Sequence, residues 1–274
     1  MSRCLSHCML IAAFLLSGAA YAVPTKIKIY HNPSVGVQTE ALVFEAVRNL
    51  LPQYSLFEEE ASVDRALKNV QQKDGLCVRN LLKNKERSEY LLFSEPLTYF
   101  LGLNVYASPK LIDTQTHTFA SLQELFAKQP NWVLGVEKER SYGDAIDNLI
   151  RTLPAKQLYR KDGSENEAQM HAMLVANRID ILFEYPSVIA YHNSFKALLR
   201  ENQPIALAVT EISPLASGRI ACIDTPETRA FLDDFNTQLK QLYNTSQFME
   251  WHLNYISPSL HAQFQHAFSL LKSN

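Results

Sequence analysis

The chain has 274 residues, of which 47% are hydrophobic and 20% are charged, and its formal net charge is −2. A chain of this length and apolar content can bury the core of one large domain or of two modest lobes. The slightly negative charge argues against a nucleic-acid partner, because such partners select a basic protein face. We find no charge run, low-complexity tract or internal repeat.

The first 22 residues have the organisation of a secretory signal peptide. Arg3 gives a positive start, an apolar stretch runs from Met9 to Leu16, and Ala20-Tyr21-Ala22 matches an A-x-A cleavage site. The apolar stretch is too short to span a bilayer. Ala19 occupies the position at which a lipoprotein would need a cysteine. Cleavage after Ala22 would leave 252 of the 274 residues (274 − 22) as an exported protein, in the periplasm or, as the alternative, fully secreted.

Two cysteines remain after this cleavage, because Cys4 and Cys8 leave with the signal peptide. Cys77 and Cys222 can form one pair, and an oxidising compartment favours a disulfide between them. The bond would close a loop of 145 positions (222 − 77) and stabilise the fold by about 4 to 5 kcal/mol in the chain-entropy model. The alternative is two buried free thiols.

The hydrophobic pattern predicts alternating strands and helices in the first third of the exported chain. The predicted order is strand 26–30, helix 38–51, strand 54–57, helix 63–70 and strand 76–78. This β-α-β-α-β order implies a sheet with parallel members and with helices on its faces.

A second α/β unit begins with a predicted strand at 101–106. It continues with a helix at 122–126, a strand at 132–136, a helix at 145–150 with Ser141 as N-cap, a helix opened by a Ser164–Glu167 capping box, and strands at 179–183 and 205–209. The last segment predicts a strand at 219–223, a helix with Pro226 at its first position, and short helices at 248–255 and 260–271.

We interpret this order as an α/β protein of two lobes that are joined by two crossings. The first lobe would take residues 23–103 plus 210–274, and the second lobe would be the insert 104–209. Cys77 and Cys222 lie on opposite sides of this insert but both belong to the first lobe, which fits the division. A cleft between two hinged lobes is a usual place for a small ligand.

Three stretches resemble segments of the family 3 periplasmic solute-binding proteins, which are the polar amino acid receptors of ABC importers. Glu86-Arg87 followed by Phe93-Ser94-Glu95-Pro96 resembles the family's E-R-x5-F-S-x-P segment. Leu134-Gly135-Val136 leading to Ser141-Tyr142-Gly143 is similar to its V-G-V strand, loop and hydroxyl residue, and Asn177–Phe183 resembles its G-R-x-D-A-x-x strand. The resemblance covers nearly all of the exported chain and implies a type II fold that closes on its solute.

The resemblance also implies a site for a ligand carboxylate. Arg87 would bind this group with its planar fork of donors. Ser141 would meet the same group with its hydroxyl and the helix N-terminus, or would serve only as a helix cap. Tyr142 would cover an apolar part of the ligand or pack between the lobes. Asn80 and Tyr185 complete this part of the expected ligand-binding set.

Two departures from the family pattern argue against an ordinary α-amino acid as the ligand. Tyr185 stands where an aspartate commonly pairs with the ligand ammonium, and Leu82 stands where a hydroxyl residue is usual. Glu184 could substitute for that aspartate, but strand alternation would point its side chain away from that of Tyr185. Arg140, in the loop before Ser141, is expected either to bind a second negative group of the ligand or to be a solvated loop residue.

Two further charged residues are expected to serve structure rather than binding. Asp180 follows a helix-to-strand turn and would bond backbone amides there. Arg65, on the helix before the Cys77 strand, would reach either the cleft or the surface, and we favour the surface.

We predict a binding protein rather than an enzyme, because the sequence has no His-Glu-x-x-His pattern, no G-x-S-x-G elbow and no phosphate loop. No cofactor or metal is expected. The expected partners of this monomer are a small anionic or amino-acid-like solute and an ABC importer permease or a membrane sensor. A dehydratase or lyase is the remaining alternative, for which Glu137 and Glu184 are the only carboxylates to name.

Overall fold

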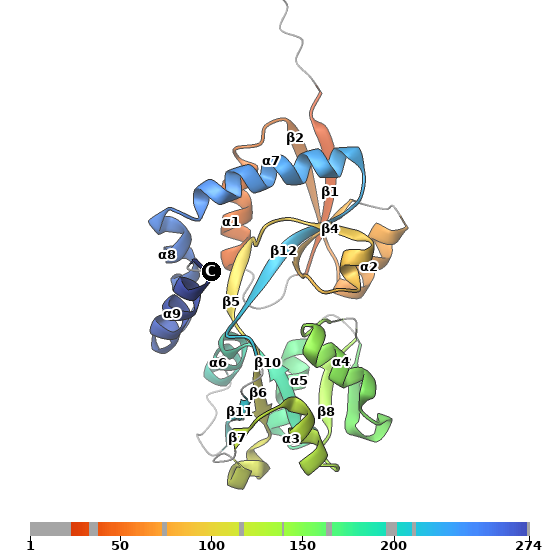
Figure 1. Ribbon diagram of the computed structural model, residues 1–274, viewed down its shortest axis with the longest axis vertical. Coiled ribbons are helices and arrows are strands. Elements are labelled where there is room, and N and C mark those ends of the chain that lie inside the picture. The colour runs from red at the N-terminus through yellow and green to blue at the C-terminus, as the bar shows by residue number, and fades with distance from the viewer. Residues whose placement is uncertain are drawn as a thin grey trace, which may run out of the picture.

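The computed structural model describes residues 23–32, 38–72, 76–114, 118–138, 140–162, 166–195, 202–209 and 212–272. These residues form two lobes stacked along the long axis of the molecule, each with a sheet flanked by helices (Figure 1). The predicted two-lobed α/β fold is therefore confirmed. The predicted signal peptide at 1–22 and the capping serine Ser164 lie outside the described residues.

The sheet of the first lobe takes strands from both ends of the chain. Its order is β2-β1-β3-β12-β4, and β5 also pairs with β12. Strands β1, β2 and β3 are parallel, whereas β12 runs antiparallel to β3, β4 and β5. The strand bounds are β1 (Thr25–His31), β2 (Tyr54–Glu60), β3 (Cys77–Leu82), β4 (Leu91–Phe93), β5 (Thr98–Leu101) and β12 (Leu215–Ile223).

Five α-helices of the described chain belong to this lobe, and apolar side chains hold them to the sheet. They are α1 (Gln38–Arg48), α2 (Val63–Gln71), α7 (Pro226–Leu242), α8 (Ser246–Asn254) and α9 (His261–Lys272). Phe44 of α1 and Phe235 of α7 stack with ring centroids 6.0 Å apart in the core. Helix α7 begins at Pro226, as predicted, after a capping box of Thr225 and Thr228. None of the described helices has both the length and the apolar character that crossing a membrane requires.

The sheet of the second lobe has the order β7-β11-β6-β10-β8-β9. Strands β8, β9 and β10 are parallel, and β6 is antiparallel to β10 and β11. The strand bounds are β6 (Asn104–Ala107), β7 (Thr118–Phe119), β8 (Leu134–Glu137), β9 (Leu158–Lys161), β10 (Ile181–Glu184) and β11 (Ile205–Val209). The α-helices are α3 (Leu122–Lys128), α4 (Asp144–Thr152), α5 (Asn166–Val175) and α6 (Pro186–Phe195).

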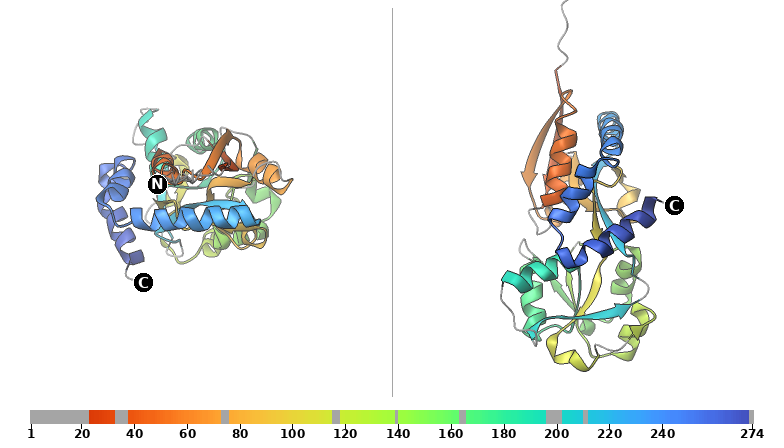
Figure 2. Two further views of the ribbon diagram at one scale, coloured as in Figure 1. Left: turned by 90° about the horizontal axis from the view of Figure 1, so that it is seen from above. Right: turned by 90° about the vertical axis from the view of Figure 1, so that its left-hand side faces the viewer.

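Two crossings join the lobes, and the prediction of one strand at 101–106 is wrong because the first crossing divides it. Strand β5 lies in the first sheet, β6 lies in the second, and Gly102-Leu103 passes between them (Figure 2, right). The Gly102 backbone N donates to Pro214 O at 2.8 Å, so the two crossings are bonded to each other. A Cβ on Gly102 would lie 1.8 Å from Ser213 O, which only glycine avoids. The lobe boundaries at 103/104 and 209/210 stay predictions.

The predicted disulfide between Cys77 and Cys222 is present. Cys77 is the first residue of β3, and Cys222 is its register partner on β12. Both side chains are fully buried in the core of the first lobe. The bond therefore ties the strands that precede the second lobe in the chain to the strand that follows it.

Candidate functional site

Each lobe has one point at which its parallel strands reverse their winding. In the first sheet β1 lies between β2 and β3, and α1 and α2 are the connections. In the second sheet β8 lies between β9 and β10, and α4 and α5 are the connections. Ligands of open α/β sheets bind in the crevice beyond the carboxyl ends of the strands at such a point. We call these positions the first crevice, beyond β1 and β3, and the second crevice, beyond β8 and β10.

Hydrogen bonds join the two lobes directly between these crevices. Asn84, which follows β3, donates from Nδ2 to Ser141 Oγ at 3.0 Å. The next backbone amide, Lys85 N, donates to Asp144 Oδ1 at 3.2 Å. Because Ser141 and Asp144 flank the start of α4, which follows β8, the two crevices face each other.

Arg87 lies in the wall of the first crevice, where its side chain is 6% exposed. Its Nη1 donates to Leu82 O at 3.0 Å, and its backbone N donates to Asn84 Oδ1 at 2.8 Å. Because Asn84 also binds Ser141, one amide brings together the two residues that the sequence assigned to one cleft. Asn84 was not among the predicted site residues, although an Asn three residues before a helical turn is a known local capping signal.

Ser141 is not the N-cap of α4, contrary to the prediction. Helix α4 begins at Asp144 after Gly143, whose φ of +96° lies in the left-handed region that favours glycine. Ser141 Oγ instead donates to Asp147 Oδ2 at 2.5 Å, and Asp147 Oδ1 accepts from Tyr142 N at 2.8 Å. A carboxylate of the chain thus occupies donors beside α4 where the resemblance places a ligand anion.

Arg140 is not a solvated loop residue. Its Nη1 and Nη2 donate to Glu184 Oε2 and Oε1 at 2.8 and 2.7 Å, and Nη1 also donates to Glu137. These carboxylates are the last residues of β10 and β8, and the Glu184 side chain is only 2% exposed. Burial opposes the guanidinium charge, but Glu184 and Glu137 outweigh it and raise the pKa of Arg140 well above its ordinary value.

Two tyrosine rings cover the guanidinium of Arg140. The Arg140 Cζ lies 4.9 Å from the ring centroid of Tyr142 and 5.6 Å from that of Tyr185. Tyr142 is buried within the second lobe, its hydroxyl accepts from Glu137 N at 2.9 Å, and burial raises its pKa. Tyr185 faces the first lobe, where its ring centroid lies 5.6 Å from that of Phe100.

The expectation that Glu184 and Tyr185 point to different sides is wrong. Strand β10 ends at Glu184 and α6 begins at Pro186, so strand alternation does not extend to Tyr185. Glu184 Oε1 accepts from Tyr185 N at 2.9 Å, and both side chains contact Arg140. The second crevice therefore holds a compact cluster of one guanidinium, two carboxylates and two rings.

Asn80 lies near the carboxyl end of β3, beside the first crevice, with a φ of +57°. Its Oδ1 is buried, and no hydrogen-bond partner for it exists among the described residues. A Cβ on Gly218 would lie 1.8 Å from this oxygen, so the glycine on β12 leaves room for the amide. A buried acceptor of this kind suits a ligand donor, and the ligand-binding role of Asn80 stays a prediction.

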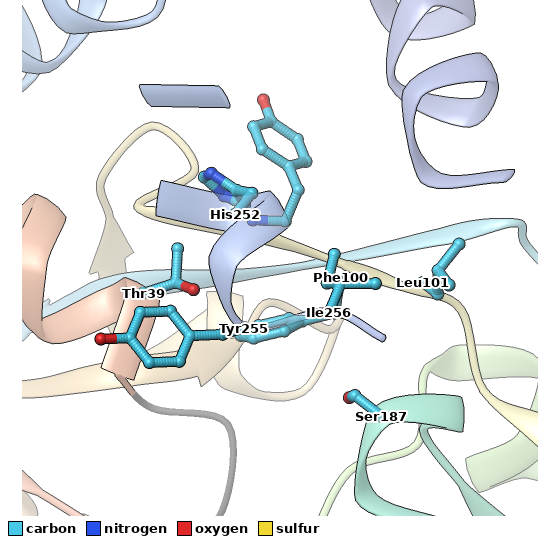
Figure 3. Close-up of a pocket in the computed structure, with 8 residues that line it drawn as sticks. Thr39, Phe100, Leu101, Ser187, His252, Tyr255 and Ile256 are labelled. Atoms are coloured by element: carbon cyan, nitrogen blue, oxygen red, sulfur yellow. Dashed lines mark hydrogen bonds between the residues drawn. The ribbon is translucent and has the colours of Figure 1, made fainter. Parts of the chain in front are cut away.

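A pocket opens beside the crossing of the lobes, and none of the predicted site residues lines it, although Tyr185 contacts its lining residue Phe100 (Figure 3). Ser187 of the second lobe faces a wall from the first lobe that consists of Thr39, Tyr99, Phe100, Leu101, His252, Tyr255 and Ile256. His252 Nδ1 donates to Phe248 O at 2.7 Å, and its Nε2 accepts from Tyr99 N at 3.1 Å. Burial lowers the pKa of His252 to about 4, so this histidine is a neutral structural group.

The two residues expected to serve structure do so. Asp180 Oδ2 accepts from Val133 N at 2.9 Å, and its Oδ1 lies 2.6 Å from Lys110 Nζ. Arg65 is exposed and donates to the backbone oxygen of Glu60 at 2.9 Å. Within the described ranges, no group of three or more His, Cys, Asp or Glu side chains is arranged to hold a metal ion.

Neither a protein-family model nor a curated protein matches the sequence. Solved structures do match the fold. A histidine kinase sensor domain with similarity to periplasmic binding proteins is 12% identical, with a TM-score of 0.66, and the match covers 86% of this chain and 99% of that one. The ancestral amino acid-binding protein AncCDT-1, a precursor of cyclohexadienyl dehydratase, is 14% identical, with a TM-score of 0.62, and the match covers 85% of this chain and 96% of that one. A putative L-cystine ABC transporter protein from Listeria monocytogenes is 12% identical, with a TM-score of 0.64, and the match covers 86% of this chain and 97% of that one.

These likenesses establish the fold of the chain. It is the type II two-lobed fold of the periplasmic binding proteins, as the three sequence stretches implied. At identities of 11 to 14% they say nothing of the ligand.

Proposed function

We propose that the chain is a periplasmic solute-binding protein that closes its two lobes on a small carboxylate-bearing solute. One observation carries the proposal: Asn84 accepts from the backbone N of Arg87 in the first lobe and donates to Ser141 of the second, at the point where the two crevices meet. A guanidinium fork on one wall and a hydroxyl on the other form a suitable pair for a carboxylate.

The contacts of Asp147 support the nature of this solute. Ser141 Oγ and Tyr142 N both donate to its carboxylate, so these donors already bind an oxyanion of the required kind. A solute carboxylate would exchange with Asp147 at Ser141 while Arg87 contributes the opposing positive charge. The two lobes are in direct contact at Asn84 and Ser141. A solute would bind beside this contact or displace it.

Delivery of the solute to an ABC importer permease is the role we favour. A ligand-binding partner of a membrane sensor is the second candidate, since the same fold occurs in a histidine kinase sensor domain and in transporter proteins. An importer or sensor-kinase gene next to the gene for this chain would separate the two roles. A lyase is not favoured, because Glu137 and Glu184 both bind Arg140.

A thermal-shift screen of amino acids, dicarboxylates and small peptides tests the proposal on the protein without its signal peptide. A solute at 100 times its Kd stabilises the folded state by about 2.7 kcal/mol, which raises the Tm by roughly 5 to 10 °C. Arg87→Lys keeps the charge but loses the fork, and we expect it to abolish most of this shift. Arg65→Ala is the surface control and should keep the shift. A hit that both variants bind equally well would contradict the carboxylate site.

A further inference from the structure

The second crevice is already occupied by a group of the chain. Strands β8 and β10 end there in Glu137 and Glu184, which is where an open α/β sheet binds its ligand. The group between these carboxylates is the guanidinium of Arg140, and its side chain is 16% exposed. We propose that the second crevice is a guanidinium-binding site, for which Arg140 serves as a ligand built into the chain.

The hydrogen bonds of this site match a guanidinium rather than a generic cation. Two adjacent nitrogens of Arg140 meet the two oxygens of Glu184 in a parallel pair, and Glu137 accepts a further bond. Such a fork-to-fork pair depends on planar geometry, which an ammonium lacks.

The two tyrosine rings of the site are a second feature that suits a guanidinium. Tyr142 and Tyr185 place their ring centroids 4.9 and 5.6 Å from Arg140 Cζ, within the range of a cation–π contact. The two rings come from the loop before α4 and from the residue before α6. Carboxylates and rings from four separate positions in the chain thus converge on one side chain.

Arg140 reaches this site from a loop and not from a strand or helix. It follows Glu137 by three residues, in the connection between β8 and α4, and folds back over the end of the strand that it has just left. Shortening its side chain therefore empties the crevice, while Glu137 and Glu184 stay at the ends of β8 and β10. The vacated site would accept a small guanidinium compound from solution.

The occupied site restricts the solute that we propose above, and in this respect the inference rests on the proposed function. The positive charge of Arg140 already satisfies Glu184, so the solute needs no cationic group at the second lobe. We infer that carboxylates and dicarboxylates are bound in preference to amino acids with a cationic side chain.

Chemical rescue tests the guanidinium site without any solute. We expect Arg140→Ala to melt roughly 6 to 20 °C below the natural protein, because it leaves Glu184 buried without its partner. Methylguanidinium at up to 20 mM should recover several degrees with saturation, and methylammonium or sodium chloride at equal ionic strength should recover less than half as much. The natural protein, the Arg140→Ala/Glu184→Gln double variant and the surface control Arg151→Ala should show no such recovery.

Equal recovery with methylguanidinium, methylammonium and salt would overturn the proposal. If Arg140→Ala does not fold, Arg140→Lys carries the test, because it keeps the charge and loses the fork. A melting temperature for Arg140→Lys several degrees below that of the natural protein is expected, and equal melting temperatures would overturn the proposal. Failure of this rescue leaves the carboxylate site of Arg87 untouched, and failure of the carboxylate screen leaves the rescue untouched.

Discussion

The two crevices have the same place in their sheets but differ in the side chains that border them. The second crevice is filled by a charged cluster in which Arg140, Glu137 and Glu184 satisfy one another. The first crevice has a neutral amide, Asn80, with a buried oxygen that lacks a partner in the described chain, and it borders the buried Arg87. Strand order therefore decides where a crevice lies, while the residues at the strand ends decide whether it is occupied or ready for a ligand.

The comparison extends to what holds each lobe together. The first sheet is built from strands on both sides of the second lobe and carries the disulfide, whereas the strands of the second sheet all lie between Asn104 and Val209. Each lobe also contains one tryptophan, Trp251 in the first and Trp132 in the second. Single-tryptophan variants can therefore report on each lobe separately.

The largest expected effect is the loss of the disulfide. Replacing Cys77 and Cys222 by alanine should lower the free energy of unfolding of the first lobe by about 4 to 5 kcal/mol, because a loop of 145 positions is no longer closed in the unfolded state. Urea titrations followed by Trp251 fluorescence should show this loss. If Trp132 fluorescence shifts its midpoint by the same amount, the lobes do not unfold separately and the comparison fails.

Acid should weaken the first lobe through His252. Its folded pKa of about 4 lies below the ordinary value of 6.5, so between pH 6.5 and 4 only the unfolded state binds the extra proton. Stability from this group is complete above pH 6.5 and falls by about 3 kcal/mol by pH 4. Unfolding of His252→Gln should show a smaller loss over the same window. An imidazole resonance of His252 that titrates between pH 7 and 6 would contradict the assignment.

Glu184→Gln should weaken the second lobe by about 2 to 3 kcal/mol, because two bonds from Arg140 to a carboxylate become at most one bond to a neutral amide oxygen. Unfolding followed by Trp132 fluorescence measures the change. Glu89→Gln, an exposed carboxylate in the first lobe, is the control and should change stability by less than about 0.5 kcal/mol. Equal effects of the two variants would argue against a cluster that matters for stability.

The bond between Asn84 and Ser141 should contribute about 1 kcal/mol to the contact between the lobes. A double-mutant cycle of Asn84→Ala and Ser141→Ala, read from thermal unfolding, isolates this coupling. Small-angle X-ray scattering should show a larger radius of gyration for Asn84→Ala if the bond holds the lobes closed. A cycle with zero coupling would mean that the crevices meet without help from this bond.

The smallest effect is expected in the first crevice. Asn80→Gly removes a buried oxygen without a described partner and keeps a residue that tolerates the φ of +57°, so stability should change by less than about 0.5 kcal/mol. Chemical denaturation checks this. A loss as large as that of Glu184→Gln would show that the first crevice is as tightly organised as the second.

The fold and the disulfide could be predicted from the sequence because both depend on patterns that local residues record. Apolar periodicity predicted the strands and helices, and the predicted loss of the signal peptide would leave two cysteines, which allow only one pair. The prediction of one strand at 101–106 was wrong because it used the same apolar pattern. Its apolar residues run on through Gly102, and only the hydrogen bond to Pro214 shows that the chain changes lobe there.

The site was less predictable because its contacts join residues that lie far apart in the sequence. The sequence predicts Ser141 as a helix cap, but Gly143 is the N-cap. The Ser141 hydroxyl donates to Asp147 instead. Arg140 has one local partner, Glu137, but Glu184, which accepts two of its bonds, is 44 positions away. The partners of these side chains follow only from packing.

The position of β12 determines when the first sheet can be completed. This strand lies between β3 and β4 and also pairs with β5, so the residues up to Leu101 hold five of the six strands of the first sheet but leave one edge of β3 unpaired. Cys77 lies on that edge, and its disulfide can form only when β12 brings Cys222 beside it. The strands of the second lobe all precede β12 in the chain, so they can pair with one another before the first sheet is complete. The edge of β3 therefore stays unpaired until the last strand of the first sheet is available.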